Sequence, residues 1–382
     1  MSQGIAVWFL DNMKNTVPKN VHNSNFLQYW YQTCLEPCGG GVDLGGMLKK
    51  DKKVYTECFD SIITIENLLR AWREFKRGKT KKLDVQEFER NLIENLVLLH
   101  SDLKAGTYRH GGYEAFKIND PKPRDIHKAL VRDRVVHHLL YRSLAPFFFR
   151  VFIADSYSCQ LGKGTHKALN RFAEFSSRVS KNNSQQCYVL KCDIKKFFAS
   201  TDHRILQDIL KSSIEDKKLL ALLHIVICSF NSGVKGKGLP LGNLTSQLLV
   251  NIYMHEFDKY IKHTLKIKHY IRYADDFVVL SRDTSELIQI LASMNIFLQN
   301  RLELTFHPKK VSIATVASGV DFLGWVHFPK HRIIRPVSRK RMYRKLFESK
   351  CENTLVQSYF GLLKHGNTHK LLTEIRDSLR RN

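Results

Sequence analysis

The sequence lacks long apolar runs, internal repeats and low-complexity blocks. Its longest apolar stretches, such as Leu219–Ile227, fall far short of the roughly 20 residues that a membrane helix needs. Met1–Leu10 has neither a basic start nor a clear small-residue cleavage site. Cys34 and Cys38 lie close together, but no second pair or histidine follows at zinc-finger spacing. We therefore expect no membrane partner, no secretory signal and free thiols, as in a cytoplasmic protein.

Acidic residues are also scarce. The 382 residues include 36 Asp and Glu but 61 Lys and Arg, which gives a formal net charge of +25. Apolar residues make up 43% and aromatic residues 11%, enough for a sizeable core, so a wholly disordered chain is excluded. A folded chain with this charge favours a polyanionic partner. Composition alone leaves a ribosomal-type or a membrane-surface protein open as alternatives.

Hydrophobic periodicity begins only after a glycine-rich segment, residues 1–46, which we interpret as a poorly ordered N-terminal extension. Short apolar stretches predict strands at Tyr188–Ile194, Tyr270–Leu280 and Val320–Phe328. Helices are predicted near 65–75, 84–100 (with a capping box at Asp84 and Glu87), 126–152, 202–229, 244–265 and 284–301, a hairpin around Gly111 and Gly112, and a basic helical tail from His331. Because strands and helices do not alternate regularly, an α+β fold fits better than a doubly wound sheet.

Three acidic residues stand where buried strands are expected. Asp193 follows the apolar strand Tyr188–Leu190, and Asp275 and Asp276 interrupt the apolar stretch Tyr270–Leu280. An unpaired buried carboxylate is costly, so something must neutralise these groups. A tight turn between two strands is one solution, because Asp tolerates turn geometry. A divalent cation is the other, since carboxylates on neighbouring strands can bridge two ions about 3.5–4 Å apart for phosphoryl transfer.

Short motifs around these acids resemble, in order, those of bacterial reverse transcriptases. Tyr273–Asp276 resembles the YxDD box, and Asp193 with Phe197 and Phe198 resembles the first palm aspartate box. The remaining matches are fingers motifs at Pro121–Arg124, Arg132–His138 and Gly162–His166, a nucleotide-pocket motif at Gly238–Gln247, a lysine-bearing motif at Leu302–Lys310 and a primer-grip motif at Val320–Trp325. The resemblance spans about residues 64–370. It implies a right-hand polymerase with N-terminal helices and fingers at 47–186, a palm at 187–330 and a helical thumb at 331–382.

The resemblance implies an RNA-directed DNA polymerase that uses two Mg²⁺ ions. Asp193 and Asp275 would be metal ligands, with the backbone carbonyl of Ile194 as a third contact, and Asp276 would support the site. The partners would be a template RNA with its primer and deoxynucleotides. A catalytically inactive RNA-binding module is an alternative, but the intact acids argue against it.

Further residues align with the family's nucleotide contacts. Lys117 and Arg124 would hold the triphosphate, unless they are general RNA-facing charges. Lys310 would be a general acid near pyrophosphate, although the neighbouring Lys309 could take that role. The other nucleotide contacts would be Phe198 under the 2′ carbon (or Phe197, if the register differs by one), and Gly242 and Gln247 as the floor of the pocket, where Asn243 or Thr245 could also cap a helix.

The C-terminal region is rich in cations and carries a subfamily resemblance. The basic run, Arg332–Lys345, contains no acid. We expect it to follow the nucleic-acid backbone through Arg332, Arg335, Arg339, Lys340, Arg341 and Arg344. Ser246–Gln247 and the segment Ser358–Thr368 resemble the reverse transcriptases of diversity-generating retroelements. Those enzymes copy a template RNA with errors at adenines and work with a small basic accessory protein. A reverse transcriptase of antiphage defence is the alternative.

Overall fold

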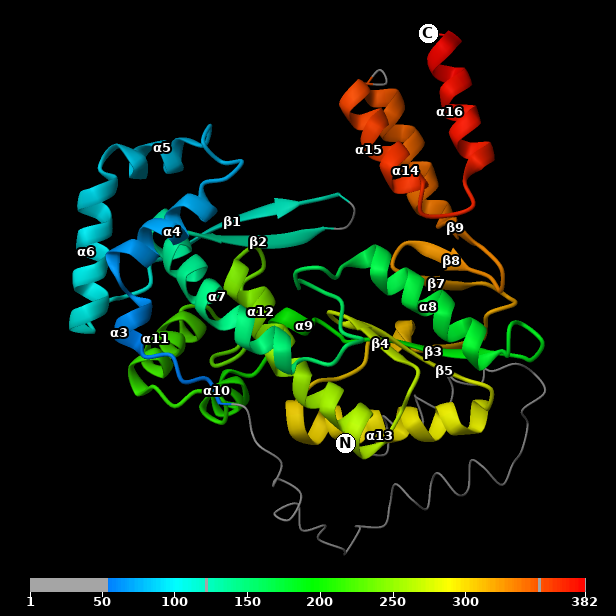
Figure 1. Cartoon of the computed structure of the whole chain (residues 1–382), viewed down its shortest axis with the longest axis horizontal. Coiled ribbons are helices and arrows are strands. Elements are labelled where there is room, and N and C mark those ends of the chain that lie inside the picture. The colour runs from blue at the N-terminus through cyan, green and yellow to red at the C-terminus, as the bar shows by residue number, and fades with distance from the viewer. Residues whose placement is uncertain (1–53, 121–122, 350–351, 382) are drawn as a thin grey trace, which may run out of the picture. The chain divides into compact units, whose positions relative to one another are not determined.

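The computed structural model describes residues 54–120, 123–349 and 352–381 (Figure 1). The expected extension at 1–46, with Cys34 and Cys38, lies outside these residues. The chain divides into two compact units that do not follow chain order. Unit 1 comprises the described residues up to Val151 together with Phe198–Tyr253, and unit 2 comprises Phe152–Phe197 and the residues from Met254 onward.

Unit 1 is largely helical. Thr64 caps α4, because its hydroxyl accepts the N–H of Asn67. The predicted capping box at Asp84 is wrong, because the helix already begins one residue earlier and the Asp84 carboxylate pairs with Arg134 and Lys128 instead. The helices of unit 1 are α3 (Phe59–Ile62), α4 (Ile65–Phe75), α5 (Leu83–Arg90), α6 (Leu92–Ala105), α7 (Val131–Val151), α10 (His203–Lys211) and α11 (Lys217–Cys228), while α9 (Phe197–Ser200) and α12 (Leu244–Lys259) contain boundaries between the units.

The hairpin of unit 1 lies further along the chain than its glycines indicate. β1 (Tyr113–Ile118) pairs antiparallel with β2 (Arg124–Ala129). Gly111 and Gly112 therefore precede the first strand rather than form its turn. The helix predicted from residue 126 begins only at Val131, because the preceding residues are held in the ladder with β1.

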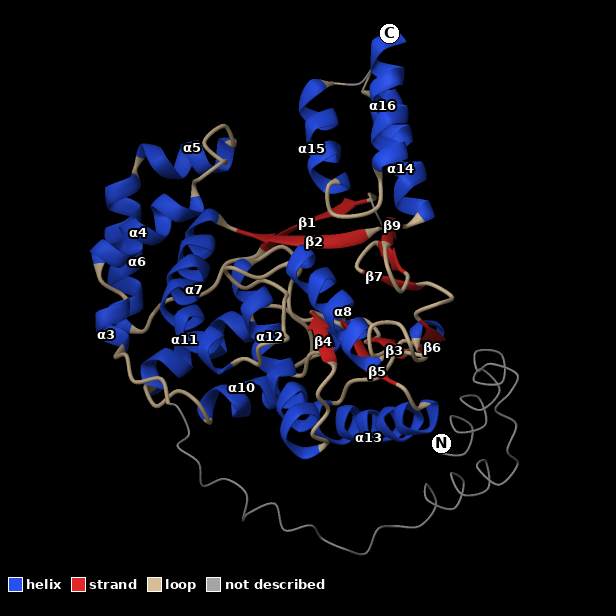
Figure 2. Cartoon of the chain, turned by 45° about the vertical axis from the view of Figure 1, so that its right-hand side comes forward, coloured by secondary structure: helices blue, strands red, loops and turns tan. Residues whose placement is uncertain are grey.

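Unit 2 contains a four-stranded antiparallel sheet of order β4-β5-β3-β6. Its strands are β3 (Tyr188–Asp193), β4 (Tyr270–Tyr273), β5 (Asp276–Ser281) and β6 (Ser312–Thr315). Figure 2 places α8 (Thr165–Val179) and α13 (Thr284–Leu302) on opposite faces of this sheet. Val278 and Val279 are adjacent and point to opposite faces of the sheet. Both are buried because both faces are covered, which is why these strands are continuous apolar runs in the sequence.

A second sheet and three helices complete unit 2. β7 (Val320–Phe322), β8 (Trp325–His327) and β9 (Arg332–Ile334) form an antiparallel sheet, so the predicted strand at 320–328 is in fact a tight hairpin. The tail predicted to be helical from His331 starts with β9, and helix begins at Pro336, whose fixed φ suits a first helical position. The helices are α14 (Pro336–Glu348), α15 (Asn353–Leu363) and α16 (His369–Arg381). Within the described ranges, no helix is both long and apolar enough to cross a bilayer.

Candidate active site

The three acidic residues meet at one end of the larger sheet. Asp193 is the last residue of β3 and lies opposite Asp276, the first residue of β5. Asp275 lies in the two-residue turn between β4 and β5, and its carbonyl accepts the N–H of Ile194 at 3.3 Å. This tight turn brings Asp275, and Asp276 directly after it, beside Asp193.

Burial and mutual repulsion set the electrostatics of this cluster. Burial, and then the charges of Asp276 and Asp193, raise the pKa of Asp275 to about 6. Burial also raises the pKa of Asp276, while Lys191 opposes this shift. The Lys310 ammonium donates to Asp193 Oδ2 at 2.7 Å, so one cation already compensates the cluster. The site therefore favours binding of further positive charge.

The donor set at this cluster suits magnesium. Carboxylate and carbonyl oxygens are the ligands that this hard cation prefers. The Lys310 ammonium already places one positive charge beside Asp193. Among the described residues, no three His, Cys, Asp or Glu side chains are already arranged as a metal cage. Nucleotide phosphates would have to supply the remaining ligands, which is how Mg²⁺ is commonly bound with triphosphates.

The structure distinguishes between the two candidate lysines. Pro308–Lys310 forms a single 3₁₀ turn, anchored where the N–H of His307 donates to the carbonyl of Asp193 at 2.7 Å. This turn directs Lys310 onto Asp193, whereas only the backbone N–H of Lys309 is bonded, to His307 Nδ1. Lys310 is therefore the lysine at the carboxylates.

Sequence reasoning missed the buried ion pair that holds the turn. Arg272 donates through Nε and Nη2 to Asp258 at 2.8 and 2.6 Å, and both side chains are fully buried. The Tyr270 hydroxyl donates to the same carboxylate at 2.8 Å. Arg272 Nη1 also donates to the carbonyl of Ala274 at 3.2 Å, and Ala274 has a φ of 56°, in the left-handed region that residues with a Cβ seldom adopt. An arginine inside an apolar strand was the available signal.

The glycine-led motif is held against the hairpin of unit 1. Gly242 has a φ of 108°, and a Cβ there would lie 2.7 Å from Ile126 Cγ2. The Asn243 amide donates to the carbonyl of His127 at 2.8 Å and accepts the N–H of Ala129 at 3.3 Å, which ties the start of α12 to β2. The Thr245 hydroxyl bonds to the buried His137. Gln247 is exposed one helical turn further on.

The two predicted triphosphate contacts do not share a face of the hairpin. Lys117 lies opposite Asp125, while Arg124 lies opposite Ile118, and neighbouring residues of a strand point to opposite faces. Arg124 shares its face with Ile126, which contacts Gly242. Arg124 therefore lies on the face that carries the glycine motif, and Lys117 lies on the other.

The two adjacent phenylalanines differ in burial. Phe197 is 3% exposed and belongs to the core, whereas Phe198 is only partly buried. The Phe198 carbonyl accepts the N–H of Leu239 at 2.8 Å, which ties it to the start of the glycine motif.

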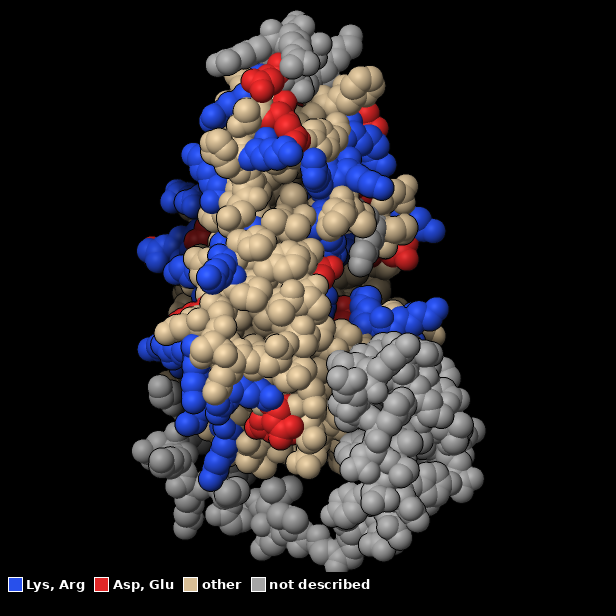
Figure 3. All heavy atoms as spheres, turned by 90° about the vertical axis from the view of Figure 1, so that its right-hand side faces the viewer, with Lys and Arg blue, Asp and Glu red and all other residues tan. Residues whose placement is uncertain are grey.

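The basic run is less free than its composition indicates, because acids from other elements reach it. Arg335 donates from Nε to Asp321 at 2.9 Å, and Arg332 is bonded to Asn170 and the carbonyl of His365. Weaker ion pairs link Arg339 to Glu374 (3.4 Å) and Arg344 to Glu348 (3.7 Å), while Lys340 is exposed and Arg341 is half-buried. Figure 3 still shows Lys and Arg gathered around the upper end of this side, where α14–α16 lie.

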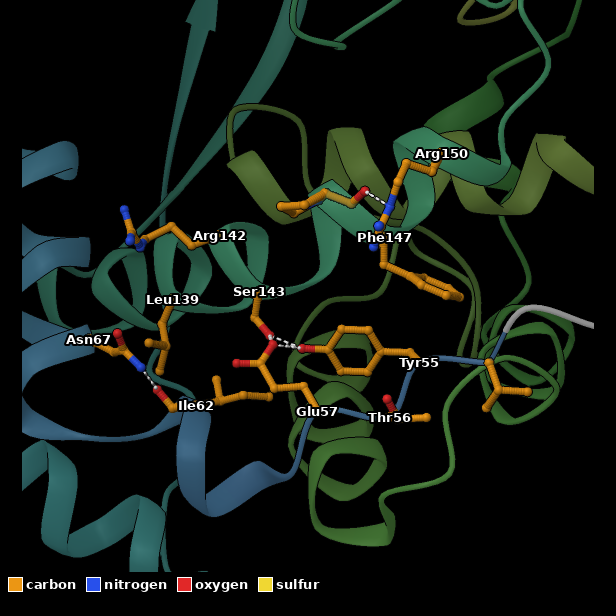
Figure 4. Close-up of a pocket in the computed structure, with 12 residues that line it drawn as sticks. Tyr55, Thr56, Glu57, Ile62, Asn67, Leu139, Arg142, Ser143, Phe147 and Arg150 are labelled. Atoms are coloured by element: carbon orange, nitrogen blue, oxygen red, sulfur yellow. Dashed lines mark hydrogen bonds between the residues drawn. The ribbon is translucent and has the colours of Figure 1, made fainter.

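A separate cavity of about 410 Å³ in unit 1 contains none of the predicted site residues. Its polar groups bond to one another: the Tyr55 hydroxyl donates to Glu57 at 2.5 Å, and the Asn67 amide donates to the carbonyl of Ile62 at 3.2 Å (Figure 4). Asp193, Asp275 and Asp276 all lie in unit 2.

This chain was compared with known protein families, proteins and solved structures. Residues 119–327 match the family described as "Reverse transcriptase (RNA-dependent DNA polymerase)". Protein YkfC of Escherichia coli is 24% identical over 65% of this chain and 73% of its own length. Group II intron-encoded protein LtrA of Lactococcus lactis is 20% identical over 61% of this chain, which spans about half (49%) of LtrA. A solved telomerase structure from Candida albicans aligns with a TM-score of 0.47 and 11% identity, over 65% of this chain and 51% of that one.

The buried pair generates a stability prediction. Asp258→Asn should lower the free energy of unfolding by about 3 kcal/mol or more, because it leaves the Arg272 guanidinium buried without a counter-charge. Glu348→Gln is the matched control, since its pair with Arg344 is exposed and should contribute less than about 1 kcal/mol. Chemical denaturation of both variants measures the difference. Equal effects would contradict the anchoring role of Asp258.

Proposed function

The chain belongs to the reverse transcriptase family of RNA-dependent DNA polymerases, and we propose that it performs two-metal nucleotidyl transfer at Asp193, Asp275 and Asp276. The observation that carries this proposal is the convergence of three acids at one end of the sheet, with the pKa of Asp275 raised to about 6. In the proposed reaction the primer 3′-hydroxyl attacks the α-phosphate of a deoxynucleotide. The new P–O bond forms as the bond to pyrophosphate breaks.

The family generally uses Mg²⁺, and we assign two ions to this cluster. Asp193, Asp275 and the carbonyl of Ile194 would hold them, and Asp276 would support the site. When bound, magnesium stabilises charge on the attacking and leaving oxygens. Lys310, already on Asp193, is positioned to deliver a proton from Nζ toward the leaving pyrophosphate.

The contacts to the nucleotide are assigned from the faces of unit 1. Arg124 would grip the triphosphate, because it shares a face with Ile126 and the glycine motif. Lys117 lies on the other face and is better suited to a general contact with RNA. Gly242 and Gln247 would form the floor of the pocket, and Phe198 would lie under the sugar.

We retain the fingers, palm and thumb as functional regions at 47–186, 187–330 and 331–382. Within the thumb, exposure and weak pairing favour Arg339, Lys340 and Arg344 for contact with the template–primer backbone. Arg332 and Arg335 hold the protein itself together, and Arg341 is intermediate.

The proposed setting is a diversity-generating retroelement, in which the enzyme would copy a template RNA with errors at adenines. The support is the resemblance of Ser246–Gln247 and Ser358–Thr368 to that subfamily. A small basic accessory protein would be a partner. Antiphage defence is the competing role.

The site assignment predicts that Asp275→Asn abolishes primer extension without loss of stability. The amide removes an oxygen ligand, which should cost several kcal/mol in the barrier, and it also relieves repulsion within the cluster. Primer extension on an RNA template in Mg²⁺ and thermal denaturation are the measurements. Asp208→Asn, at an exposed carboxylate of α10, is the control. Extension by Asp275→Asn at the control's rate would refute the assignment.

The sugar contact predicts that Phe198→Ala raises ribonucleotide incorporation relative to deoxynucleotides by about tenfold, equivalent to about 1.4 kcal/mol. The ring leaves a 2′-hydroxyl without space or a hydrogen-bond partner. Competition between the two nucleotides during extension measures the ratio. Phe197→Ala is the matched control and should instead destabilise the core. Relaxed selectivity in the Phe197 variant alone would place the gate one residue earlier.

The retroelement setting predicts an error spectrum dominated by misincorporation opposite template adenines. Sequencing of cDNA made on a template with all four bases in equal number measures it. Low and even error at the four bases would favour the defence role and leave the polymerase assignment intact.

A further inference from the structure

A two-lobed groove in unit 2 has no role in the proposed reaction. One lobe, of about 470 Å³, lies among α8, the turn between β8 and β9, and the segment between α15 and α16. The other, of about 500 Å³, lies among the end of α8, the start of β3 and the residues after β6. The lobes share Ser176, Pro329, Lys330 and His331 and therefore adjoin; we refer to the two together as the groove.

The wall of the first lobe is fixed by the segment between α15 and α16. Asn367 donates its N–H to the carbonyl of Arg332 at 2.8 Å, and Arg332 Nε donates back to the carbonyl of His365. Gly366 fits beneath Trp325 so closely that a Cβ would lie 2.1 Å from the indole ring. Lys364 and His365 are therefore held in place over the groove. Part of the motif Ser358–Thr368 therefore forms a wall of this groove, a structural role that the polymerase reaction does not require.

The lining combines cations with aromatic rings. Lys330, Arg332 and Lys364 line the first lobe, and no carboxylate does so among the described residues. Phe328 and His331 stack with ring centroids 4.9 Å apart. Basic side chains beside stacked rings are the combination that holds single-stranded nucleic acid, through phosphate contacts and base stacking.

A buried imidazole points to a ligand within the groove. His327 is 3% exposed and packs on Phe172, with ring centroids 4.3 Å apart. Burial lowers the pKa of His327 to about 3, so the ring is neutral at physiological pH. Its Nε2 has no hydrogen-bond partner among the described residues. A buried polar atom without a partner is costly, and a base edge could satisfy it.

The groove is distinct from the catalytic carboxylates. Cys187 and Val316 line its second lobe, next to the pair Tyr188 and Thr315 that begins the β3–β6 ladder. Asp193 ends the same strand, and five steps of a strand span roughly 16 Å. Apart from Lys330, which both lobes share, no lysine or arginine of the described residues lines the second lobe, and Asn183 and Gln186 are among its side chains. Such amide groups suit base edges better than phosphates.

We propose that this groove binds an unpaired segment of RNA, with phosphates along Lys330 and Lys364 and bases against Phe328, His331 and the amide side chains of the second lobe. An acidic peptide would use the cations but leave the rings and amides without partners. The lining includes none of Arg339, Lys340 and Arg344, which we propose for the template–primer backbone, so occupancy of the groove does not require polymerisation.

The test uses the full chain saturated with a blunt RNA–DNA hybrid, so that the catalytic region is occupied. A labelled single-stranded RNA of about 12 nucleotides is then titrated by fluorescence anisotropy. The double variant Lys330→Gln/Lys364→Gln should bind this RNA about tenfold more weakly, with the slope of log affinity against log salt reduced by about 0.7 for each lost contact. Primer extension, measured separately on a hybrid with a recessed DNA primer and an RNA template overhang, should not change.

Lys266→Gln/Lys268→Gln is the matched control, because both lysines are exposed in unit 2 and neither lines the groove. A second variant, His327→Phe, keeps the ring on Phe172 but removes Nε2, and it should weaken RNA binding severalfold without lowering the melting temperature. Equal affinity for the groove and control variants would overturn the proposal. So would a parallel loss of primer extension, which would assign the groove to the template–primer track. Failure of these binding tests would leave the Asp275→Asn result, and thus the polymerase assignment, unaffected.

Discussion

Repulsion among three clustered carboxylates, of which Asp193 is buried and Asp275 and Asp276 are half-buried, is the constraint on which unit 2 depends. The register of β3 against β5 forces Asp193 and Asp276 to face each other, and the turn adds Asp275. Placing like charges so close together costs free energy, and other interactions must offset that cost. The neighbouring structure supplies what is needed: Lys310 and Lys191 bring positive charge, and the buried Arg272–Asp258 pair fixes the turn. Burial, and then the charges of Asp276 and Asp193, raise the pKa of Asp275, and binding of a cation would favour its charged form.

The same logic explains why this arginine is buried at all. A buried ion pair contributes little net stability compared with apolar packing, but it orients groups precisely. Arg272 donates two hydrogen bonds to Asp258 and a third to the carbonyl of Ala274, whose backbone is in the left-handed conformation. The pair therefore acts on the position of Asp275 rather than on the stability of the sheet alone.

Features that depend on local sequence patterns could be predicted from the sequence alone. Asp193, Asp275 and Asp276 stood out because acids seldom interrupt apolar strands, and the strands themselves were apolar on both faces. The partner of Arg272 could not be predicted, because Asp258 lies on a helix and meets it only after folding. The hairpin was misplaced because Gly111 and Gly112 are strong turn signals, whereas pairing with β1 extended residues 124–129. Likewise the basic run contains no acid of its own, yet Asp321 and Glu374 reach it from elsewhere.

The order of strands in the larger sheet has a consequence for synthesis on the ribosome. β3 is a central strand, apolar on both faces, and its two partners are Asp276–Ser281 and Ser312–Thr315, far later in the chain. Until those segments emerge, β3 has neither its ladder nor both covering helices. The nascent protein therefore carries an unpaired, aggregation-prone strand until residues 276–281 and 312–315 have been made, and the end of the sheet that holds the three carboxylates assembles late.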